Sequence, residues 1–290
     1  MKIAVICPFQ NEQSRGYAQG VIEHLLERKI TVLVDSKMED FLKNPETVSY
    51  VSVFKTLPKD TDFLFCIGGD GSMLRAIITV KDSNVPILGI NTGRLGFLTS
   101  LQKESLNVGL KQLWENKYTL IDRSLLEVQL PDSNELIDSF PYALNEVSVN
   151  RKNTASLISI DTRLDNQPLT TYWADGLIIS TPTGSTGYSL SSGGPIMSPL
   201  TAGFVLTPIA PHNLNIRPLI IPNSTTIEFE VTGRGEDHLL SLDSRIISVD
   251  QGTRILVKKA PFTLVTVELH DNAFFKTLRD KLFWGLDTRN

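Results

Sequence analysis

The sequence contains few cysteines, only Cys7 and Cys66 among 290 residues. Each lies in an apolar run, IAVICPF or FLFCIGG, so the pattern offers no disulfide framework and predicts two buried thiols. Such low cysteine content is typical of a protein from a reducing compartment. The four histidines lack the spacing of a zinc site, and no metal-ligating residue is assigned from the sequence.

A basic excess and a long apolar run are also missing. The formal net charge is -4, which argues against binding to a nucleic-acid backbone. No stretch approaches the roughly 18 apolar residues that cross a membrane. The N-terminal run KIAVIC is too short for a signal peptide and is predicted to be the first strand. We therefore expect a soluble, cytoplasmic protein that binds neither nucleic acid nor a membrane.

The first hundred residues alternate between short apolar runs and helix-like segments. Apolar runs such as ITVLVD, FLFCIGG and PILGIN alternate with the helical patterns GYAQGVIEHLLERK, at residues 16–29, and SMLRAIITVKD, at residues 72–82. This alternation predicts right-handed crossovers and a parallel sheet of the Rossmann-like α/β class. Ligands of such sheets bind beyond the carboxyl ends of the strands.

After about residue 98 the pattern changes to short runs with a period of two residues or with β-branched side chains. Examples are SLLEVQL, NEVSVN, LISIDTRL, GLIIST, TRILVKK and FTLVTVEL, separated by turn residues. They predict an all-β, sandwich-like domain. We expect an α/β domain at 1–98, a β-rich domain at 99–265 and a helix at 266–290. Phe274, Phe275, Leu278 and Leu282 share one face of that helix, which is expected to pack back on the first domain.

The segment IGGDGS joins a predicted strand to a predicted helix. Glycines at such a junction allow close backbone approach to a ligand, so Gly68, Gly69 and Ser72 are predicted to form a phosphate loop. The segment lacks the lysine of a P-loop and the third glycine of a dinucleotide fingerprint. Asp70 is either a capping carboxylate of a tight turn or a group that acts on a hydroxyl.

Two further segments are rich in glycine. NTGRLGFL, at 91–98, follows a predicted strand and is either a simple loop or the second wall of the same cleft. STPTGSTGYSLSSGGP, at 180–195, has the composition of a linker, but its hydroxyl groups and backbone N–H groups also suit a polyanion or a sugar.

Three polar residues have equally ambiguous positions. Asn145 and Glu146 open a predicted strand, and Asp175 precedes another. An asparagine can pair with the edge of adenine and a carboxylate with ribose hydroxyls, so Asn145 and Glu146 would suit a nucleoside. A polar strand end explains all three residues equally well.

Taken in order, GGDGS, NTGRLGFL, NE, ADGLIISTPTGSTGYSLSSGGP and PIAPHNLNIRPLIIP resemble the NAD kinase family over most of the chain. GGDG alone also occurs in lipid kinases and in 6-phosphofructokinases, whereas the Thr/Gly/Ser segment with the NE pair singles out NAD kinases. The resemblance implies phosphoryl transfer from ATP, with a divalent metal such as Mg²⁺, to the 2′-hydroxyl of the adenosine ribose of NAD, which gives NADP.

The resemblance also implies roles for individual residues. Asp70 corresponds to the proposed catalytic proton acceptor, and Asn145 and Glu146 correspond to contacts with the dinucleotide. Asp175 corresponds to a residue that typically reaches the site of a neighbouring subunit. Members are commonly homodimers or homotetramers built through the β domain, so the resemblance implies that residues 99–265 bind NAD and form the oligomer. The complete set of implied substrate contacts is Gly71, Arg75, Asn145, Glu146, Ser156, Trp173, Asp175, Thr183, Thr186, Gly187, Tyr188, Ser189, Leu190, Ser191, Ala210 and Arg245.

Four of these positions depart from residues that are frequent in the family. They are Ser156, Trp173, Gly187 and Arg245, where some members have His, Arg, Ala and Gln. The departures concern contacts to the nicotinamide half of the substrate and the preference between NAD and NADH. Two other functions share parts of the pattern: a lipid kinase of the diacylglycerol type, with the same GGDG loop, and a non-catalytic sensor of NAD or NADP.

Overall fold

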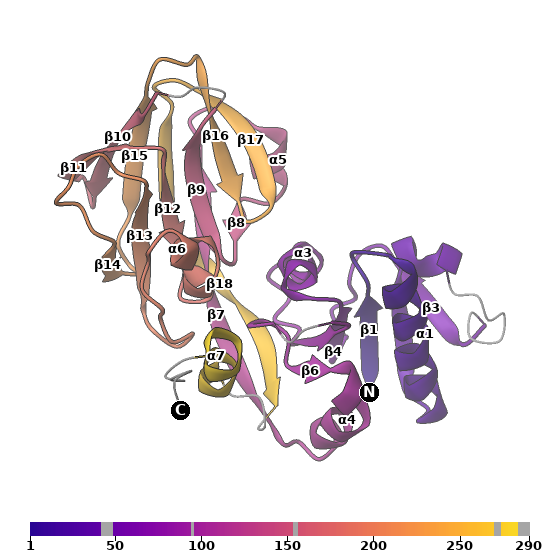
Figure 1. Cartoon of the computed structure of the whole chain (residues 1–290). Helices are drawn as coiled ribbons and strands as arrows, with labels where there is room; N and C mark the ends of the chain where they lie inside the picture. Colours follow the sequence, from indigo (N-terminus) through magenta and orange to yellow (C-terminus); the bar gives the residue numbers. More distant parts are fainter. Residues whose placement is uncertain (42–48, 94–95, 153–155, 270–273, 284–290) are drawn as a thin grey trace, which may run out of the picture. The chain divides into compact units, whose positions relative to one another are not determined.

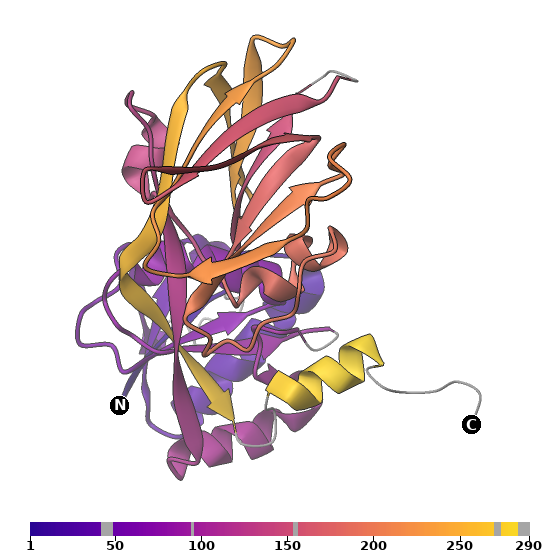
Figure 2. The ribbon, with the colours of Figure 1, turned by 90° about the vertical axis from the view of Figure 1, so that its left-hand side faces the viewer.

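The computed structural model describes residues 1–41, 49–93, 96–152, 156–269 and 274–283. The chain forms two compact units, one from Met1–Asp122 with Leu264–Asn290 and the other from Arg123–Thr263. The chain passes between them within two long strands, β7 (Tyr118–Gln129) and β18 (Arg254–Leu269). These strands pair with each other, as Figure 2 shows.

The N-terminal unit is built on a parallel sheet with the strand order β5-β4-β1-β2-β3 (Figure 1). The bounds are β1 Lys2–Ile6, β2 Thr31–Asp35, β3 Val51–Phe54, β4 Phe63–Ile67 and β5 Ile87–Asn91. Short strand β6 (Leu101–Gln102) and the end of β18 pair with β5, also in parallel. All residues of β4 and β5 are buried, as expected for central strands of a parallel sheet.

The first helix of this unit begins at a clear start signal in the sequence. Helix α1 (Glu12–Glu27) begins four residues before the predicted segment, because Asn11 and Ser14 form a capping box with bonds of 2.8 and 3.1 Å. Its buried face, including Val21 and Leu25, packs in the core with strands of the sheet. The other helical segments are η1 Ser36–Phe41, α3 Asp70–Val80, η2 Lys103–Ser105 and α4 Leu106–Trp114.

The C-terminal helix α7 (Phe274–Leu282) belongs to this N-terminal unit. The Phe274 ring lies 6.3 Å from the ring of Phe97, and Leu278 is buried. Phe275 and Leu282, however, are 65% and 37% exposed, so the prediction that they lie on a buried face is wrong. Of the four predicted residues, Phe274 contacts Phe97 and Leu278 is buried.

The second unit consists of two sheets. One is fully antiparallel, with the order β14-β13-β12-β9-β16-β17, and the other contains β11, β10, β15, part of β18, β7 and β8. The strands are β8 Tyr142–Ala143, β9 Glu146–Arg151, β10 Ile158–Leu164, β11 Gln167–Ala174, β12 Gly176–Ser180, β13 Gly203–Ile209, β14 Leu219–Pro222, β15 Ile227–Thr232, β16 Asp237–Leu242 and β17 Arg245–Asp250. Short helical segments are α5 Glu135–Ser139, η3 Gly184–Thr186 and α6 Tyr188–Ser191.

One apolar core joins the two sheets of this unit. Val147, Leu177 and Phe204 come from the first sheet, and Ile160 and Phe229 come from the second. Inward-facing residues alternate with exposed ones along strands such as β15, so the unit is a β-sandwich. The parallel α/β unit and this sandwich confirm the predicted fold class. Within the described part of the chain, every helix is too short or too polar to span a membrane.

Candidate active site

The GGDG segment forms the tight connection between β4 and α3. Gly68 has a φ of 137°, and a Cβ on this residue would lie 2.1 Å from the Ser72 Oγ. Only glycine fits this backbone conformation and this close approach. Helix α3 begins at Asp70, and no side chain caps its first turn at Gly69. The first turn therefore keeps the positive end of the helix dipole available for an anion.

The Asp70 carboxylate holds the NTGRLGFL loop by its backbone. The Phe97 N–H donates to Oδ2 at 2.8 Å, and the Leu98 N–H donates to Oδ1 at 3.0 Å. Gly96 packs against the same carboxylate, because a Cβ there would lie 1.7 Å from the Asp70 Oδ1. The loop is also tied internally by Asn91, which accepts from the Gly93 N–H at 2.7 Å. The two glycine-rich segments are therefore joined through Asp70.

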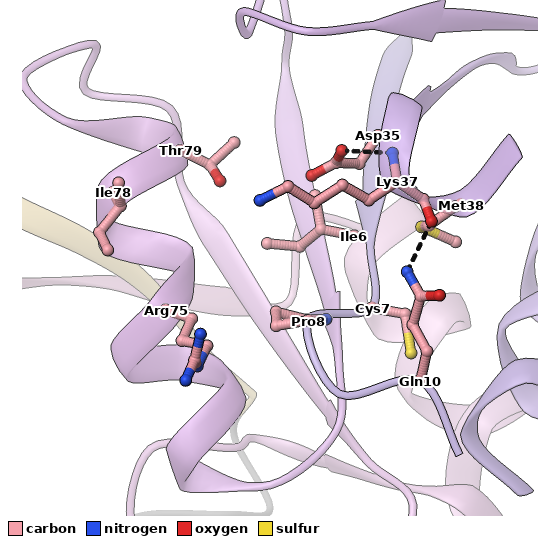
Figure 3. Close-up of a pocket in the computed structure, with 10 residues that line it drawn as sticks. All are labelled: Ile6, Cys7, Pro8, Gln10, Asp35, Lys37, Met38, Arg75, Ile78 and Thr79. Carbon is pink, nitrogen blue, oxygen red and sulfur yellow. Dashed lines mark hydrogen bonds between the residues drawn. The ribbon is translucent and has the colours of Figure 1, made fainter. Parts of the chain in front are cut away.

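A small cavity lies on the α3 side of the same unit. It has a volume of about 130 Å³ and is lined by Arg75 and Thr79 of α3, by residues after β1 and by Lys37 after β2. In Figure 3 the Lys37 side chain extends toward α3, and its backbone accepts from Gln10 at 2.7 Å. The Arg75 guanidinium lies over the ring of Phe9, 4.8 Å from its centre. Two positive side chains, Lys37 and Arg75, and one carboxylate, Asp35, thus border this cavity.

In the second unit, Asn145 and Glu146 face the turn between η3 and α6. A Cβ on Gly187 would lie 3.2 Å from the Glu146 Oε2 and 3.5 Å from the Asn145 Nδ2. The Asn145 Oδ1 and the Glu146 Oε2 are buried without a hydrogen-bond partner in the described part of the chain. Buried polar atoms normally have partners, so these two atoms indicate a place where a ligand would bind.

The Glu146 carboxyl has a strongly shifted pKa. Burial raises it to about 8, and the negative charge of nearby Asp243 adds to the shift. A hydrogen bond from the backbone N–H of Tyr188 opposes it. At neutral pH the Glu146 carboxyl is therefore mostly protonated and can donate a hydrogen bond as well as accept one.

The Thr/Gly/Ser segment is fastened to the residues just before β9. The Thr181 hydroxyl donates to the Leu144 carbonyl at 2.6 Å, and the Thr181 N–H donates to the Asn145 carbonyl at 2.9 Å. A Cβ on Gly184 would lie 2.1 Å from that carbonyl oxygen, so the close packing requires glycine. Hydrogen bonds to the rest of the protein thus fix this segment in place. A flexible linker would not be held in this way.

Several predicted substrate contacts within this segment have hydroxyl groups that are already paired. The Ser189 hydroxyl lies 2.8 Å from the Thr207 Oγ1, and the Thr183 Oγ1 accepts from Arg123 at 3.2 Å. Tyr188 is 43% exposed. Thr186, Gly187 and Tyr188 are accessible in part, whereas Ser189 is buried. Leu190 and Ser191 complete the short helix α6.

A second group of predicted residues lies at the other end of strands β9 and β12, away from Glu146 and Ser180. Asp175 forms an ion pair with Arg151, Nε to Oδ1, at 3.0 Å, and its N–H donates to the Ile209 carbonyl at 2.9 Å. Ala210 follows Ile209 with a φ of 44°. Arg151 ends β9 and Glu146 begins it, so about 16 Å of strand separates the two groups.

Trp173 and Ser156 lie near the Asp175 end. Trp173 is 52% exposed, and its carbonyl accepts from the His212 N–H at 2.7 Å. Ser156 precedes β10, whose first residue pairs with Ala174. Arg245 lies at the other end, where its guanidinium donates to the Phe140 carbonyl at 2.5 Å and also to the Tyr142 carbonyl. The structure thus divides the predicted contacts in this unit into two separate groups.

Two residues that contact these groups were not predicted from the sequence. Asp243 accepts hydrogen bonds from the N–H groups of residues 144–146, and Thr181 donates to the carbonyls of Leu144 and Asn145. In LLSLDSRI the aspartate has the signature of an ordinary turn, so nothing local indicates its partner almost a hundred residues away. Thr181 lies in the Thr/Gly/Ser segment, but the family resemblance assigns roles to Thr183 and to residues 186–191 of that segment instead.

Comparison with known proteins identifies this arrangement. Residues 3–118 match the ATP-NAD kinase N-terminal domain, and residues 144–269 match the ATP-NAD kinase C-terminal domain. The NAD kinase of Christiangramia forsetii is 49% identical over 298 residues, which cover 100% of both chains. The chain belongs to the NAD kinase family. The resemblance inferred from the motifs is therefore confirmed.

Two solved structures share this fold along almost their whole length. Yeast NADH kinase, complexed with NADH, matches with a TM-score of 0.85 and 27% identity over 100% of this chain and 89% of the yeast chain. An NAD kinase from Archaeoglobus fulgidus, in complex with ATP, matches with a TM-score of 0.76 and 26% identity over 98% and 99% of the two chains. NAD kinase relatives therefore share both units with this chain.

The raised pKa of Glu146 predicts a specific dependence of stability on pH. Between the ordinary value of 4.5 and about 8, the folded protein keeps a proton that the unfolded chain releases. The free energy of unfolding therefore falls as pH rises through this window, by at most roughly 1.4 kcal/mol per pH unit from this group. Glu146→Gln, which stays neutral, should remove this fall. Denaturant unfolding of both proteins from pH 5 to pH 8 measures it.

Glu236→Gln provides the matched control, because Glu236 is an exposed glutamate of the same unit. Its stability should follow the wild-type curve at every pH. If the free energy of unfolding changes with pH in the same way for the wild type and Glu146→Gln, burial does not hold the proton on Glu146.

Proposed function

We propose that the protein catalyses transfer of the γ-phosphoryl group of ATP to the 2′-hydroxyl of the adenosine ribose of NAD, giving NADP and ADP. The family and its relatives support NAD kinase activity, and the Archaeoglobus fulgidus relative was solved with ATP. In the reaction, the ribose oxygen attacks the γ-phosphorus, and the bond from that phosphorus to the β–γ bridging oxygen breaks. The ribose hydroxyl loses its proton, and ADP leaves.

The proposal depends above all on Asp70. Its carboxylate lies at the start of α3 and is fixed by two backbone N–H groups. An ionised carboxylate has about four acceptor positions, so the Phe97 and Leu98 donors leave about two for the 2′-hydroxyl. A general base usually contributes ~10²- to 10⁴-fold in rate. Orientation of the hydroxyl is therefore at least as important a role for Asp70 as acceptance of its proton.

The residues fit a metal that enters with ATP better than a resident metal. Among the described residues, no group of three or more His, Cys, Asp or Glu side chains could hold an ion. Mg²⁺ in phosphoryl-transfer sites is usually bound by one or two carboxylates together with substrate phosphates. Asp70 supplies one such carboxylate. When bound, Mg²⁺ would neutralise phosphate charge and favour the loose transition state.

We assign the two substrates to different groups of residues. Gly68, Gly69 and Ser72 lie at the start of α3 and suit the phosphates of the donor, whereas Gly71 and Arg75 of α3 are assigned to the substrate that accepts the phosphoryl group. In the second unit, the unpartnered Asn145 and Glu146 atoms suit the nucleoside of NAD. The turn formed by Thr186, Gly187 and Tyr188 lies beside them and is partly accessible.

The separation of Asp175 from Asn145 supports a site that subunits share. One extended strand lies between these residues within a chain, so Asp175 would serve the substrate held by a neighbouring copy. Ala210, Trp173, Ser156 and the second unit's exposed apolar residues would then lie near the interface of a homodimer or homotetramer. Those apolar residues include Leu200, Leu214, Ile220 and Ile246.

The decisive assay is direct. Purified protein is incubated with ATP, Mg²⁺ and NAD, and NADP is detected with a dehydrogenase specific for it. NADH is tested in parallel as an acceptor, because a similar yeast protein is an NADH kinase. A protein that binds NAD but forms no NADP would instead be a sensor. Phosphorylation of diacylglycerol would indicate a lipid kinase.

Asp70→Asn should lower kcat by roughly 10²-fold or more. The amide cannot accept a proton, and only its oxygen can accept from the Phe97 or Leu98 N–H. The NADP assay gives kcat, and circular dichroism checks that the protein is folded. Turnover within a few-fold of the wild type, in a folded protein, would remove Asp70 from its proposed role.

Gly96→Ala should lower kcat by about 10²-fold without any change to a polar group. The new methyl group would overlap the Asp70 Oδ1 and move the carboxylate away from the loop. Gly93→Ala is the matched control, because a Cβ there has only the Asn91 Oδ1 at 3.8 Å as a near neighbour. The NADP assay compares both variants. Equal activity of the two variants would show that the position of the Asp70 carboxylate does not limit the reaction.

If subunits share a site, inactive Asp70→Asn and Asp175→Ala chains should recover activity when mixed. A site formed by Asp70 of one chain and Asp175 of the other would be complete. The two variants are dissociated, mixed and reassembled, and NADP formation is measured against each variant alone. Absence of recovery under conditions in which labelled subunits demonstrably exchange would contradict a shared site.

A further inference from the structure

The turn between β16 and β17 lies against the residues that open β9. Leu242 pairs with Arg245, so Asp243 and Ser244 form a two-residue hairpin turn. Asp243 has a φ of 52°, a conformation that aspartate tolerates better than most residues. Its N–H donates to the Glu146 carbonyl at 2.9 Å. The tip of this hairpin is therefore bonded directly to the start of β9.

The Asp243 side chain accepts three hydrogen bonds from consecutive backbone N–H groups. The Leu144 N–H donates to Oδ2 at 2.9 Å, and the N–H groups of Asn145 and Glu146 donate to Oδ1 at 2.8 and 3.2 Å. Burial raises the pKa of Asp243, and these three donors oppose the rise. Aspartate in an ordinary turn bonds its own backbone about two residues further on, whereas Asp243 bonds backbone almost a hundred residues away.

The backbone held in this way carries the two side chains with unpartnered buried atoms. The Asn145 Oδ1 and the Glu146 Oε2 lack partners within the described residues, and both side chains lie beside Gly187. Their direction depends on the backbone at 144–146, which Asp243 bonds at three N–H groups and at the Glu146 carbonyl. Small backbone rotations here would move both side chains together.

The same hairpin also holds the chain segment that leads to this backbone. Arg245 donates to the carbonyls of Phe140 and Tyr142, and its guanidinium lies over the Phe140 ring, 5.1 Å from the ring centre. The hairpin thus binds residues 140–146 in two ways. Asp243 accepts from backbone N–H groups of this segment, and Arg245 donates to its backbone carbonyls. The two charged side chains bond different groups of one segment.

We propose that Asp243 is a positioning residue for the dinucleotide substrate, which fixes the backbone of residues 144–146 and so aims Asn145 and Glu146 at the nucleoside. This inference rests on the proposed role of Asn145 and Glu146 in binding NAD. Asp243 itself need not touch the substrate. Its effect should therefore appear in NAD binding and should depend on the presence of the two side chains that it aims.

The test is Asp243→Asn, which keeps the size and the turn preference of the residue but replaces one acceptor oxygen with a donor group. At least one of the three backbone N–H groups loses its partner. We expect the KM for NAD to rise about tenfold or more, the size of effect typical of a lost hydrogen bond to a charged group. The KM for ATP should stay within about twofold, because ATP is assigned to other residues.

The matched control is Asp165→Asn. Asp165 also lies in a two-residue hairpin turn, with a φ of 48°, and its carboxylate accepts from the Thr226 N–H at 2.8 Å. It belongs to the β10–β11 hairpin rather than the one that contacts β9. Its substitution should leave both KM values unchanged. An equal rise in the KM for NAD in both variants would show a general loss of stability and overturn the proposal.

A double-substitution cycle separates positioning from general support of the fold. Asp243→Asn is introduced into a chain that already has Asn145→Ala and Glu146→Gln. If Asp243 acts through these two side chains, its substitution should now change NAD affinity by less than about threefold. A further tenfold loss in this background would mean that Asp243 acts by another route, and the proposal would fail.

Two additional measurements keep the test decisive. If Asp243→Asn does not fold, Asp243→Glu replaces it, because the longer side chain keeps the charge but displaces the carboxylate; the same rise is expected. If the wild-type protein forms no NADP, the proposed reaction is wrong, and calorimetric titration with NAD then tests positioning alone. Weaker NAD binding by the folded variant supports the proposal, and binding equal to that of the wild type overturns it.

Discussion

Carboxylates that accept backbone N–H groups from a distant loop organise both candidate substrate regions. Asp70 joins the β4–α3 connection to the loop after β5, and Asp243 joins the β16–β17 turn to the start of β9. In each case a charged acceptor satisfies donors that loop geometry would otherwise leave unpaired. A loop fixed in this way can hold a substrate without a regular strand or helix of its own.

The requirement for glycine follows from the same interactions. Gly96 allows the loop backbone to pack directly on the Asp70 carboxylate, and Gly184 allows the Thr/Gly/Ser segment to pack on the Asn145 carbonyl. A methyl group at either position would overlap an oxygen atom that is already hydrogen-bonded. The glycines therefore serve close contact between loops as much as close approach to phosphate, which was their expected role.

Much of the fold is predictable because its physical causes are local. Buried apolar runs gave β1, β2, β4 and β5, and their alternation with helical patterns gave a parallel sheet. The prediction was weaker where a tertiary contact decided the outcome. The runs TRILVKK and FTLVTVEL form the single strand β18 despite the intervening Pro261, which lies between the residues that pair with β15, 254–257, and Thr266, which pairs with β5.

By itself, the sequence determined the family and the class of both units, and it selected GGDG, the NE pair and the Thr/Gly/Ser segment as candidate site residues. These depend on residue types in a fixed order along the chain. Only the tertiary structure showed which groups meet: Asp70 with the 96–98 backbone, Asp243 with the 144–146 backbone, and Asp175 at the far end of the strand from Glu146. Those contacts join residues that are tens of positions apart, and their partners are backbone groups that every residue except proline has. No pattern of side chains along the chain can reveal such a partner, because the selection is made by folding.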